Sequence, residues 1–444
     1  MTKLRYVKGN ITNIVGGKTK VFANEIEISS NKNINYHAPK HSYGEPEGPP
    51  KKVSKTRVKE IELLTPLDDG SKNDKSGGLQ LGFVFGKAYQ FKIKSFTNGA
   101  PVATSLIKWM IKYHSPAQNK WIETPLNVKG DNVKITLNEK EMCGRFVSVR
   151  AYIDDPETEG ELKKWKHNRF RWFDRMLVEE EINDRTDNKK PWLVNQSGTS
   201  LCGMACIFYL FAKDQPQAYK KFAKELFRTG EATFNKYTVK PSIDVLNKQP
   251  FINGILNDKQ FPWHWKLINN VSVKMYMPLI DYITMAGTRN TDNPSYKGGN
   301  EEFQAINWPP LMTKLSEEFL GYKDITSKGV YNPVKPLIYT KYAIDVRIEN
   351  INNQIRNGYS LILMIDADLI DDVWDTGSLD LHWVVLESEI KEVQMLNKNG
   401  QIEYELDFSV YTWGTSPFES KRYLKKPISK HHFMNNYNGY VKIK

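Results

Sequence analysis

Between about Val58 and residue 154, the apolar residues of this chain come in short runs of β-branched and aromatic side chains. Turn-forming residues separate the runs at intervals of roughly 10 to 20 residues, which is near the spacing of an all-β sandwich. The clearest runs are IELLTPLDDG, GFVFGKAYQFKIKSFT, SLIKWMIKYHS, DNVKITLNE and GRFVSVRAYID. We therefore expect residues 56–154 to fold into a small all-β domain.

Beyond residue 190 the pattern changes to helical periodicity followed by strands. Segment 202–213 is apolar throughout and predicts a buried helix, and 215–230 predicts an amphipathic helix that Asp214 caps and Gly230 ends. Two more helices are expected at 309–321 and 342–358, and strands at 360–366, 381–390 and 405–414. Helices first and strands last predict an α+β domain over residues 191–444.

The basic charge of the chain is confined to its first third. The net charge is +12 over 444 residues, a length that favours two or three domains. Residues 1–150 hold 25 Lys and Arg against 13 Asp and Glu, and the remaining residues hold 38 of each. Any chemistry in the C-terminal domain therefore takes place in a part of the chain whose net charge is zero.

Residues 155–190 are dense in charge and are expected to form a charged linker. Within them, Lys163–Arg175 interleaves basic and aromatic side chains, a pattern that can bind phosphates and stacked bases. Acidic residues crowd both flanks, and no nucleic-acid fold signature is present. We therefore favour a connecting helix or a last strand over a nucleic-acid surface.

The composition predicts neither a metal centre nor another cofactor. Cys143, Cys202 and Cys206 are too few for a disulfide framework or a four-cysteine zinc site, and Pro39 argues against a helix that pairs His37 with His41. No apolar run approaches the roughly 18 residues of a membrane span. The N-terminus lacks the apolar core of a secretory signal, so we expect synthesis in the cytoplasm and export by a route that reads no cleavable leader.

The segment most informative for chemistry runs from Gln196 to Cys206. Cys202 stands where a polar loop ends and the apolar helix begins, and the amides and dipole of a helix N-terminus stabilise a thiolate. Gln196 lies six residues upstream, where its amide can donate to an oxyanion together with the backbone N–H of Cys202. Cys206 is one turn further along the helix and is expected to face the core.

His382 is the candidate base for this nucleophile. It lies at the start of the apolar strand LHWVVLE, directly after a polar, acidic loop. Taken singly, Cys202 is more often an inert buried thiol and His382 a hydrogen-bonded structural histidine. The order Gln, Cys, helix and then His on a late strand favours a catalytic pair over both of these interpretations.

With these motifs, residues 191–444 resemble a papain-like cysteine peptidase, and in detail the peptidases that trim double-glycine leaders from bacteriocins. That family shows Gln-x5-Cys-Gly-x-Ala-Cys and then a His-[Phe/Trp]-Val-Val-Leu strand, and it closes with a Phe-x-x-x-aromatic-x-Gly segment. The chain supplies Gln196, Cys202–Cys206, His382–Leu386 and Phe433 to Gly439. The resemblance implies a nucleophile at Cys202, a general base and acid at His382 and an oxyanion donor at Gln196.

The chain departs from that family at the residue that orients the histidine, since Phe408–Gly414 contains no Asp. If the strands of His382 and Leu406–Trp413 pair as a hairpin, His382 lies opposite Gly414, and Asp407 is more than roughly 20 Å away at about 3.3 Å per residue. We expect the Thr412 hydroxyl to accept a hydrogen bond from the imidazole Nδ1–H. The alternatives are a Cys–His dyad with a weak orienting residue and a triad completed by a loop acid such as Asp380.

The first third of the chain also resembles two kinds of known protein module. Four of its segments are similar to the immunoglobulin-like module that precedes toxin domains in Bacteroidetes: 83–99, 107–115, 141–153 and 165–175. Residues 11–31 and SYGEPEGPP resemble the N-terminal segment of type VI secretion cargo. The resemblance implies a delivery segment at 1–55, an Ig-like sandwich at 56–154 and secretion into a target cell without a signal peptide.

Together these features predict a secreted bacterial toxin whose papain-like cysteine hydrolase cleaves an amide bond in a protein or peptide. A peptidoglycan amidase, a deamidase or a transglutaminase of the same fold remains open, as does a catalytically inactive binding effector. The expected partners are a protein, peptide or peptidoglycan substrate, components of the type VI needle and a cognate immunity protein. Nucleic acid is not an expected partner.

Overall fold

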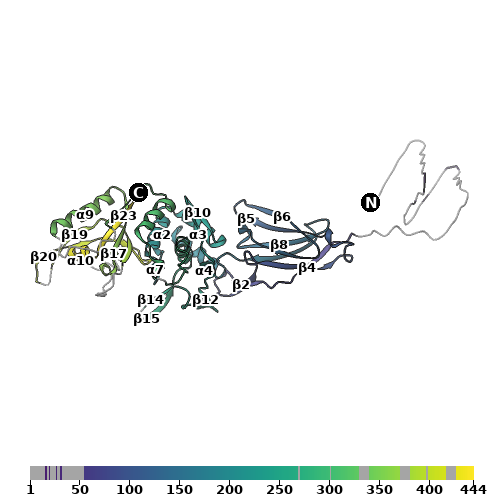
Figure 1. Cartoon of the computed structure of the whole chain (residues 1–444), viewed down its shortest axis with the longest axis horizontal. Coiled ribbons are helices and arrows are strands. Elements are labelled where there is room, and N and C mark those ends of the chain that lie inside the picture. Colours follow the sequence, from purple (N-terminus) through teal and green to yellow (C-terminus); the bar gives the residue numbers. More distant parts are fainter. Residues whose placement is uncertain are drawn as a thin grey trace. The chain divides into compact units, whose positions relative to one another are not determined.

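The computed structural model describes residues 55–268, 271–300, 302–329, 340–370, 381–396, 399–416 and 427–444, with six isolated positions before residue 55. The chain divides into two units, 1–56 and 57–444, of which the second is described below (Figure 1). Apart from those six positions and Lys55, the expected delivery segment at 1–55 lies outside the described residues, as does Asp380.

Residues 58–166 form two antiparallel sheets around one core and a further two-stranded sheet, β2-β3, so the expectation of an all-β region is confirmed. In β4 (Ala88–Phe96), Tyr89, Phe91 and Ile93 alternate with exposed residues and fill that core, as a half-buried strand requires. One sheet has the order β1-β4-β7 and the other β6-β5-β8-β9. The remaining strands are β1 (Val58–Leu63), β2 (Asp68–Ser71), β3 (Leu79–Gly82), β5 (Lys108–Ser115), β6 (Lys120–Lys129), β7 (Asn132–Thr136), β8 (Arg145–Tyr152) and β9 (Gly160–Lys166).

The segment 155–190, expected as a charged linker, contains regular structure that belongs to both neighbouring regions. Its first part supplies β9, the edge strand that pairs with β8. Its second part supplies α1 (Arg175–Arg185), which the Asp174 side chain caps. Between them, Phe170 and Phe173 are fully buried in the core of the C-terminal region. Residues 163–166 of this stretch are thus used for strand pairing, and Phe170 and Phe173 for packing.

The predicted buried helix is confirmed as α2 (Cys202–Asp214), in which every residue from Cys202 to Ala212 is buried. The next helix, α3 (Pro216–Thr229), ends at Gly230 with a φ of +69°, as its sequence predicts. The expected cap at Asp214 is wrong, because that residue ends α2 and Gln215 precedes the proline that opens α3.

Shorter elements follow these two helices. The helices are α4 (Ile243–Leu246), α5 (Leu279–Asp281), α6 (Gly287–Asp292), α7 (Glu302–Ala305) and α8 (Pro309–Lys314), with π-helical segments at Tyr282–Ala286 and Leu315–Phe319. The strands are β10 (Ala232–Phe234), β11 (Tyr237–Val239), β12 (Phe251–Ile252), β13 (Ile255–Leu256), β14 (Trp263–Ile268), β15 (Val271–Tyr276) and β16 (Ile325–Lys328). The hairpin β14–β15, which was not expected from the sequence, lies against the candidate site.

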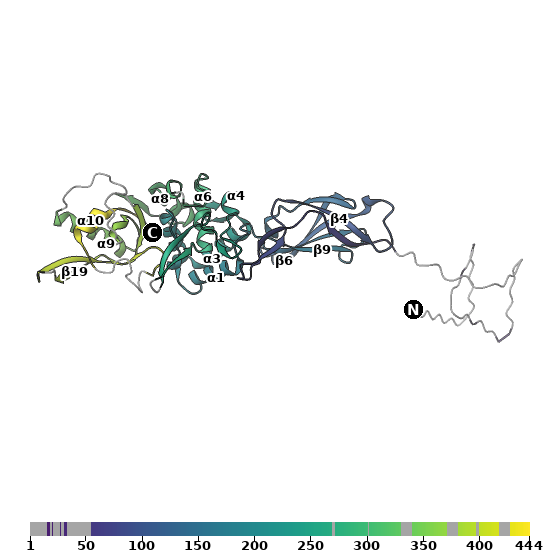
Figure 2. The same cartoon turned by 90° about the horizontal axis from the view of Figure 1, so that it is seen from below.

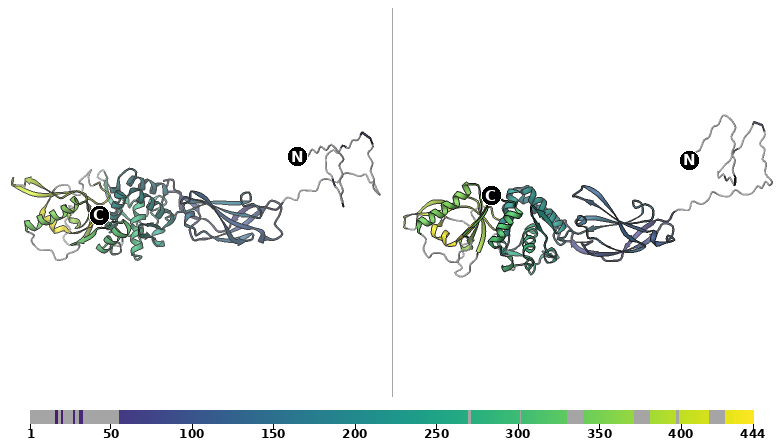
Figure 3. Two further views of the ribbon diagram at one scale, coloured as in Figure 1. Left: turned by 90° about the horizontal axis from the view of Figure 1, so that it is seen from above. Right: turned by 45° about the horizontal axis from the view of Figure 1, so that its top comes forward.

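The C-terminal sheet separates two apolar cores. Its order is β16-β23-β17-β18-β21, with β17 (Ser360–Asp366), β18 (Leu381–Leu386), β21 (Val410–Tyr411) and β23 (Tyr437–Ile443). Alternate residues of β18 face opposite sides: Trp383 and Val385 share a core with α2, while Val384 and Leu386 share one with α9 (Lys341–Arg356) and α10 (Lys430–Asn436). β17 and β23 lie between α9 and α2 in Figure 1, and Figure 3 shows the same arrangement from two other directions.

The strand pairing places His382 beside the segment that the sequence predicts. β18 pairs antiparallel with β21, Val385 opposite Tyr411, and this pairing ends before the turn at 412–415, whose Thr412 contacts His382. The expected long strand at 405–414 is divided into β20 (Ile402–Asp407) and β21, and β20 pairs with β19 (Lys391–Leu396; Figure 2) and β22 (Ile428–Ser429). Asp407 lies opposite Lys391, beyond the far end of β18, and therefore does not orient His382.

Candidate functional site

Cys202 is the first residue of α2 and is 7% exposed. Leu201 occupies the N-cap position, so no side chain caps the first turn of the helix. Amide groups at such an end are available to a negative charge, and the helix dipole has the same effect. Cys206 faces the core as predicted, where burial raises the pKa of its thiol well above the usual value. Of these two, Cys202 therefore has the setting of a nucleophile.

Gln196 is buried in the loop that leads to Cys202. Its Nε2 donates to the backbone oxygen of Thr199 at 2.8 Å, and the Thr199 hydroxyl donates to the backbone oxygen of Gln196 at 2.7 Å. These two bonds close a tight turn and fix the side chain. Because an amide NH₂ group carries two protons, one donor remains for an oxyanion.

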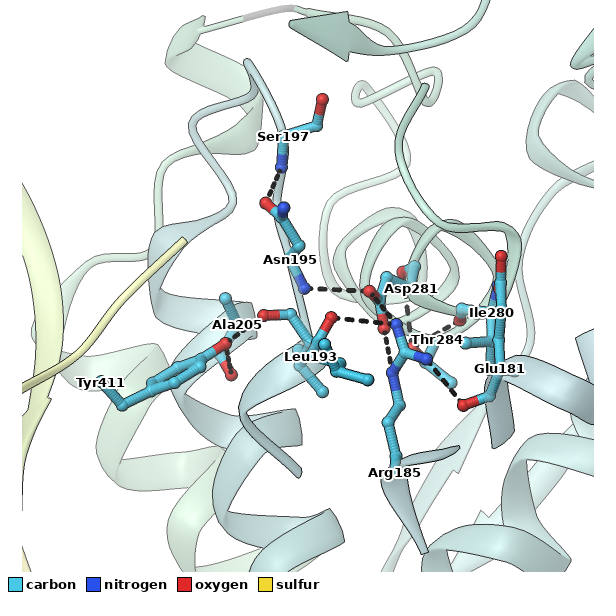
Figure 4. A network of polar contacts seen from close by, with 11 residues as sticks. Glu181, Arg185, Leu193, Asn195, Ser197, Ala205, Ile280, Asp281, Thr284 and Tyr411 are labelled. Atoms are coloured by element: carbon cyan, nitrogen blue, oxygen red, sulfur yellow. Dashed lines mark hydrogen bonds and ion pairs between the residues drawn. The ribbon is translucent and has the colours of Figure 1, made fainter. Parts of the chain in front are cut away.

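A buried ion pair anchors the start of this loop. The Arg185 guanidinium bonds both carboxylate oxygens of Asp281, at 3.1 and 2.6 Å, and also donates to the Leu193 carbonyl at 3.0 Å. Asp281 in turn accepts the backbone N–H of Asn195 at 2.9 Å. Figure 4 shows that these contacts converge on residues 193–195. The loop is thus attached to α1 and α5 by charge-assisted hydrogen bonds, which are stronger than neutral ones.

On the opposite side of the site, one tight turn holds the His382 imidazole. Thr412 Oγ1 lies 2.7 Å from His382 Nε2, and the Trp413 ring stacks on the imidazole with centroids 4.3 Å apart and an 18° interplanar angle. Thr412 is therefore in contact with His382, but through Nε2 rather than through Nδ1 as expected. Nδ1 is the ring nitrogen that this contact does not use.

The turn itself has an unusual backbone. Trp413 and Gly414 have φ values of +43° and +67°, and Thr415 N donates to the Thr412 carbonyl at 3.1 Å. Two consecutive residues with positive φ define a type I′ turn. A positive φ is sterically unfavourable for a residue with a side chain as large as that of tryptophan. The tight turn brings Trp413 over the imidazole.

Tyr411 and Gly414 connect this end of the sheet to the loop before Cys202 and to the first turn of α2. The Tyr411 hydroxyl donates to the Val194 carbonyl at 2.6 Å and lies 3.5 Å from the Ala205 carbonyl in the first turn of α2. A Cβ added to Gly414 would lie 2.9 Å from the Asn195 side chain. Since His382 contacts Thr412, the residue after Tyr411, the imidazole lies at the same end of the sheet as the loop from Asn195 to Cys202.

His382 is 4% exposed, and burial lowers the pKa of its imidazole to about 3. The ring is therefore neutral at physiological pH. A neutral imidazole can accept a proton from a thiol, whereas a resting thiolate–imidazolium pair would require a much higher pKa.

A cavity of about 260 Å³ lies beside these residues. Its walls come from the loop, the turn and the hairpin β14–β15, which was missed in the sequence although WHWKLI and VSVKMY flank an Asn-Asn turn signal. The described lining residues are Asn195, Ser197, His264, Trp265, Lys266, Trp413, Gly414 and Thr415.

Within the described ranges, no three His, Cys, Asp or Glu side chains lie together as metal ligands would. In the same part of the chain, no helix combines the length and the hydropathy needed to cross a bilayer. The chain matches no protein-family model, no curated protein and no solved structure. A functional assignment therefore depends on the geometry of the site and on the sequence motifs.

Proposed function

We propose that the chain is a cysteine-dependent amide hydrolase with a papain-like C-terminal domain. The observation that carries this proposal is the His382 imidazole, fixed by Thr412 and Trp413 at the end of the sheet where the Gln196 loop leads into α2. Cys202 at the start of that helix supplies the matching nucleophile. The order of the three residues in the sequence and the contacts that join the 412–415 region to the loop before Cys202 support this assignment.

In the proposed reaction the Cys202 sulfur attacks the carbonyl carbon of an amide while His382 Nδ1 takes the thiol proton. With Nδ1 as the base, Nε2–H donates to the Thr412 hydroxyl oxygen, which fixes the tautomer. The Gln196 amide and the Cys202 N–H bind the oxyanion. The imidazolium then protonates the leaving amine, and water, deprotonated by His382, releases the acyl group from sulfur.

We further propose that residues 58–166 are an immunoglobulin-like module that serves delivery of the hydrolase. The strand orders β1-β4-β7 and β6-β5-β8-β9 in two antiparallel sheets support this part of the proposal. Secretion into a target cell, with type VI needle components and an immunity protein as partners, follows from the N-terminal resemblance. A peptide bond is the first candidate substrate, and peptidoglycan amides or glutamine side chains are others.

The proposal is tested by labelling with iodoacetamide and locating the modified cysteine by mass spectrometry. We expect Cys202 to react first, and Cys202→Ala to abolish that labelling while the matched variant Cys206→Ala preserves it. His382→Ala should slow labelling of Cys202 about tenfold or more, because the base is lost. Expression of wild type and Cys202→Ala in the cytoplasm or periplasm of bacteria tests toxicity and its compartment.

The second candidate is a catalytically inactive binding protein. Strand alternation favours it, since Trp383 faces α2 and the adjacent His382 starts on the other face of β18. In that case Cys202 labelling does not respond to His382→Ala, and wild type and Cys202→Ala are equally toxic. Either result overturns the hydrolase proposal.

A further inference from the structure

The hairpin β14–β15 is attached directly to the loop that precedes Cys202. A Cβ added to Gly198 would lie 2.7 Å from the Trp263 carbonyl oxygen, so hairpin and loop are in close backbone contact. At the adjacent residue, Ser197 Oγ and His264 Nδ1 are hydrogen-bonded at 2.7 Å. Two consecutive loop residues thus fix the first half of β14 beside the candidate site.

The cavity between this hairpin and the 412–415 turn adjoins both halves of the site. Asn195 and Ser197, which line it, are the neighbours of Gln196 in the chain. Trp413, which lines it from the other side, is the residue that stacks on His382. At about 260 Å³ the cavity is below the roughly 300–1,000 Å³ of pockets for drug-sized ligands. It suits a single amino-acid side chain.

The side of the scissile bond that this cavity serves follows from the proposed chemistry. The imidazole protonates the leaving amine, so the amine must lie next to His382. Trp413, which stacks on that imidazole, also lines the cavity. The cavity therefore lies on the leaving side of the scissile bond, where the substrate residue that carries the amine extends.

The charge of the lining selects among side chains. Lys266 lines the cavity, and none of the described lining residues is acidic. Lys266 is exposed, and no carboxylate of the described residues pairs with it. Trp413 supplies apolar surface, while Thr415 and Asn195 supply polar groups. The Trp265 indole packs against Trp263 and Lys274, on the other face of the hairpin from His264 and Lys266. A carboxylate on a short aliphatic stem matches this combination.

We propose that this cavity is a specificity subsite for an acidic side chain, glutamate or aspartate, on the residue that follows the scissile bond. The aliphatic stem packs against Trp413, and the carboxylate pairs with Lys266. The assignment to the leaving side rests on the proposed hydrolase; the preference for acidic residues rests on the lining alone.

The test measures binding to full-length Cys202→Ala, so that no cleavage intervenes. The probes are end-capped peptides Ac-Ala-Ala-Ala-X-Ala-Ala-NH₂ with X as Glu, Gln or Lys, titrated while intrinsic tryptophan fluorescence is recorded. We expect Glu to bind about fivefold more tightly than Gln, as for an accessible ion pair, with Lys the weakest. Added salt should reduce the difference.

Adding Lys266→Glu should reverse the order of the Glu and Lys peptides. Lys328→Glu, with the same charge change on exposed β16, should leave the order unchanged. Equal binding of the three peptides, binding of none, or equal effects of the two charge reversals overturns the subsite. Cleavage of the Glu peptide by wild type is scored separately. Selective binding without cleavage removes the hydrolase and retains the acidic subsite.

Discussion

The two sides of the candidate site are held by different kinds of interaction. The loop before Cys202 is attached through the Arg185–Asp281 ion pair, whose side chains are 2% and 0% exposed. His382 is held by one hydroxyl contact and one stacked ring, both from a single turn. A nucleophile and its oxyanion donors must be fixed, whereas a base must exchange a proton and tolerate a change of charge. The contrast fits those two tasks.

The largest effect is expected from removing the ion pair. Arg185→Ala leaves the Asp281 carboxylate buried without its cation, and breaking such a pair lowers the free energy of unfolding by about 3–5 kcal/mol. The measurement is urea denaturation of the full chain. Arg356→Ala is the matched control, because its pairs with Glu349 and Glu389 are exposed to solvent and contribute little to stability. Equal losses in the two variants would show that the loop is not anchored in this way.

The two sides are also expected to respond to pH in opposite directions. Burial lowers the pKa of His382 from 6.5 to about 3, so as pH falls through that window the unfolded chain takes up a proton that the folded chain does not. The free energy of unfolding therefore decreases on acidification. Burial raises the pKa of Glu181, beside Arg185, from 4.5 to about 7, so its contribution decreases as pH rises through that range.

This opposition is measured by comparing wild type with His382→Gln and Glu181→Gln in denaturation experiments across that pH range. Each titrating group contributes a slope that approaches about 1.4 kcal/mol per pH unit. In His382→Gln, the loss of stability as pH falls from 6.5 to about 3 should disappear. In Glu181→Gln, the loss of stability as pH rises from 4.5 to about 7 should disappear. If the two variants change the profile in the same direction, the environments of the two groups are not opposite.

The parts of the site predicted from sequence are those that depend on local pattern. The apolar run after Cys202 specifies its helix, and the apolar strand that follows His382 specifies the pairing of β18 with β21. These features need only periodicity and pairing rules. The prediction that Asp214 caps α3 failed because the helix begins at Pro216, so that Gln215 occupies the N-cap position.

What sequence did not predict depends on contacts between distant segments. Asp281 supports the loop across 86 residues, and His264 reaches Ser197 across 67. Neither residue carries a motif, because each acts through a position set by the whole fold. The stack of Trp413 on His382 is of the same kind, since it requires the positive φ of a turn that local pattern does not specify for tryptophan.

The smallest expected effect comes from the single hydroxyl that contacts His382. Thr412→Val keeps the shape of the side chain but leaves Nε2 without that partner, which lowers the free energy of unfolding by about 1 kcal/mol. Cys202 labelling should slow about tenfold, because the imidazole loses its preferred tautomer and orientation. Thr412→Ser retains the hydroxyl and should restore most of the rate.

Thr412→Asn sharpens the comparison further, because a carboxamide oxygen accepts from Nε2–H as the hydroxyl does. We expect this variant to label Cys202 at least as fast as Thr412→Ser, and its pH–rate profile to follow that of wild type. The measurement is the labelling rate against pH for the four proteins. If valine and serine give the same rate, the hydroxyl does not orient the base, and the stack with Trp413 alone holds the imidazole.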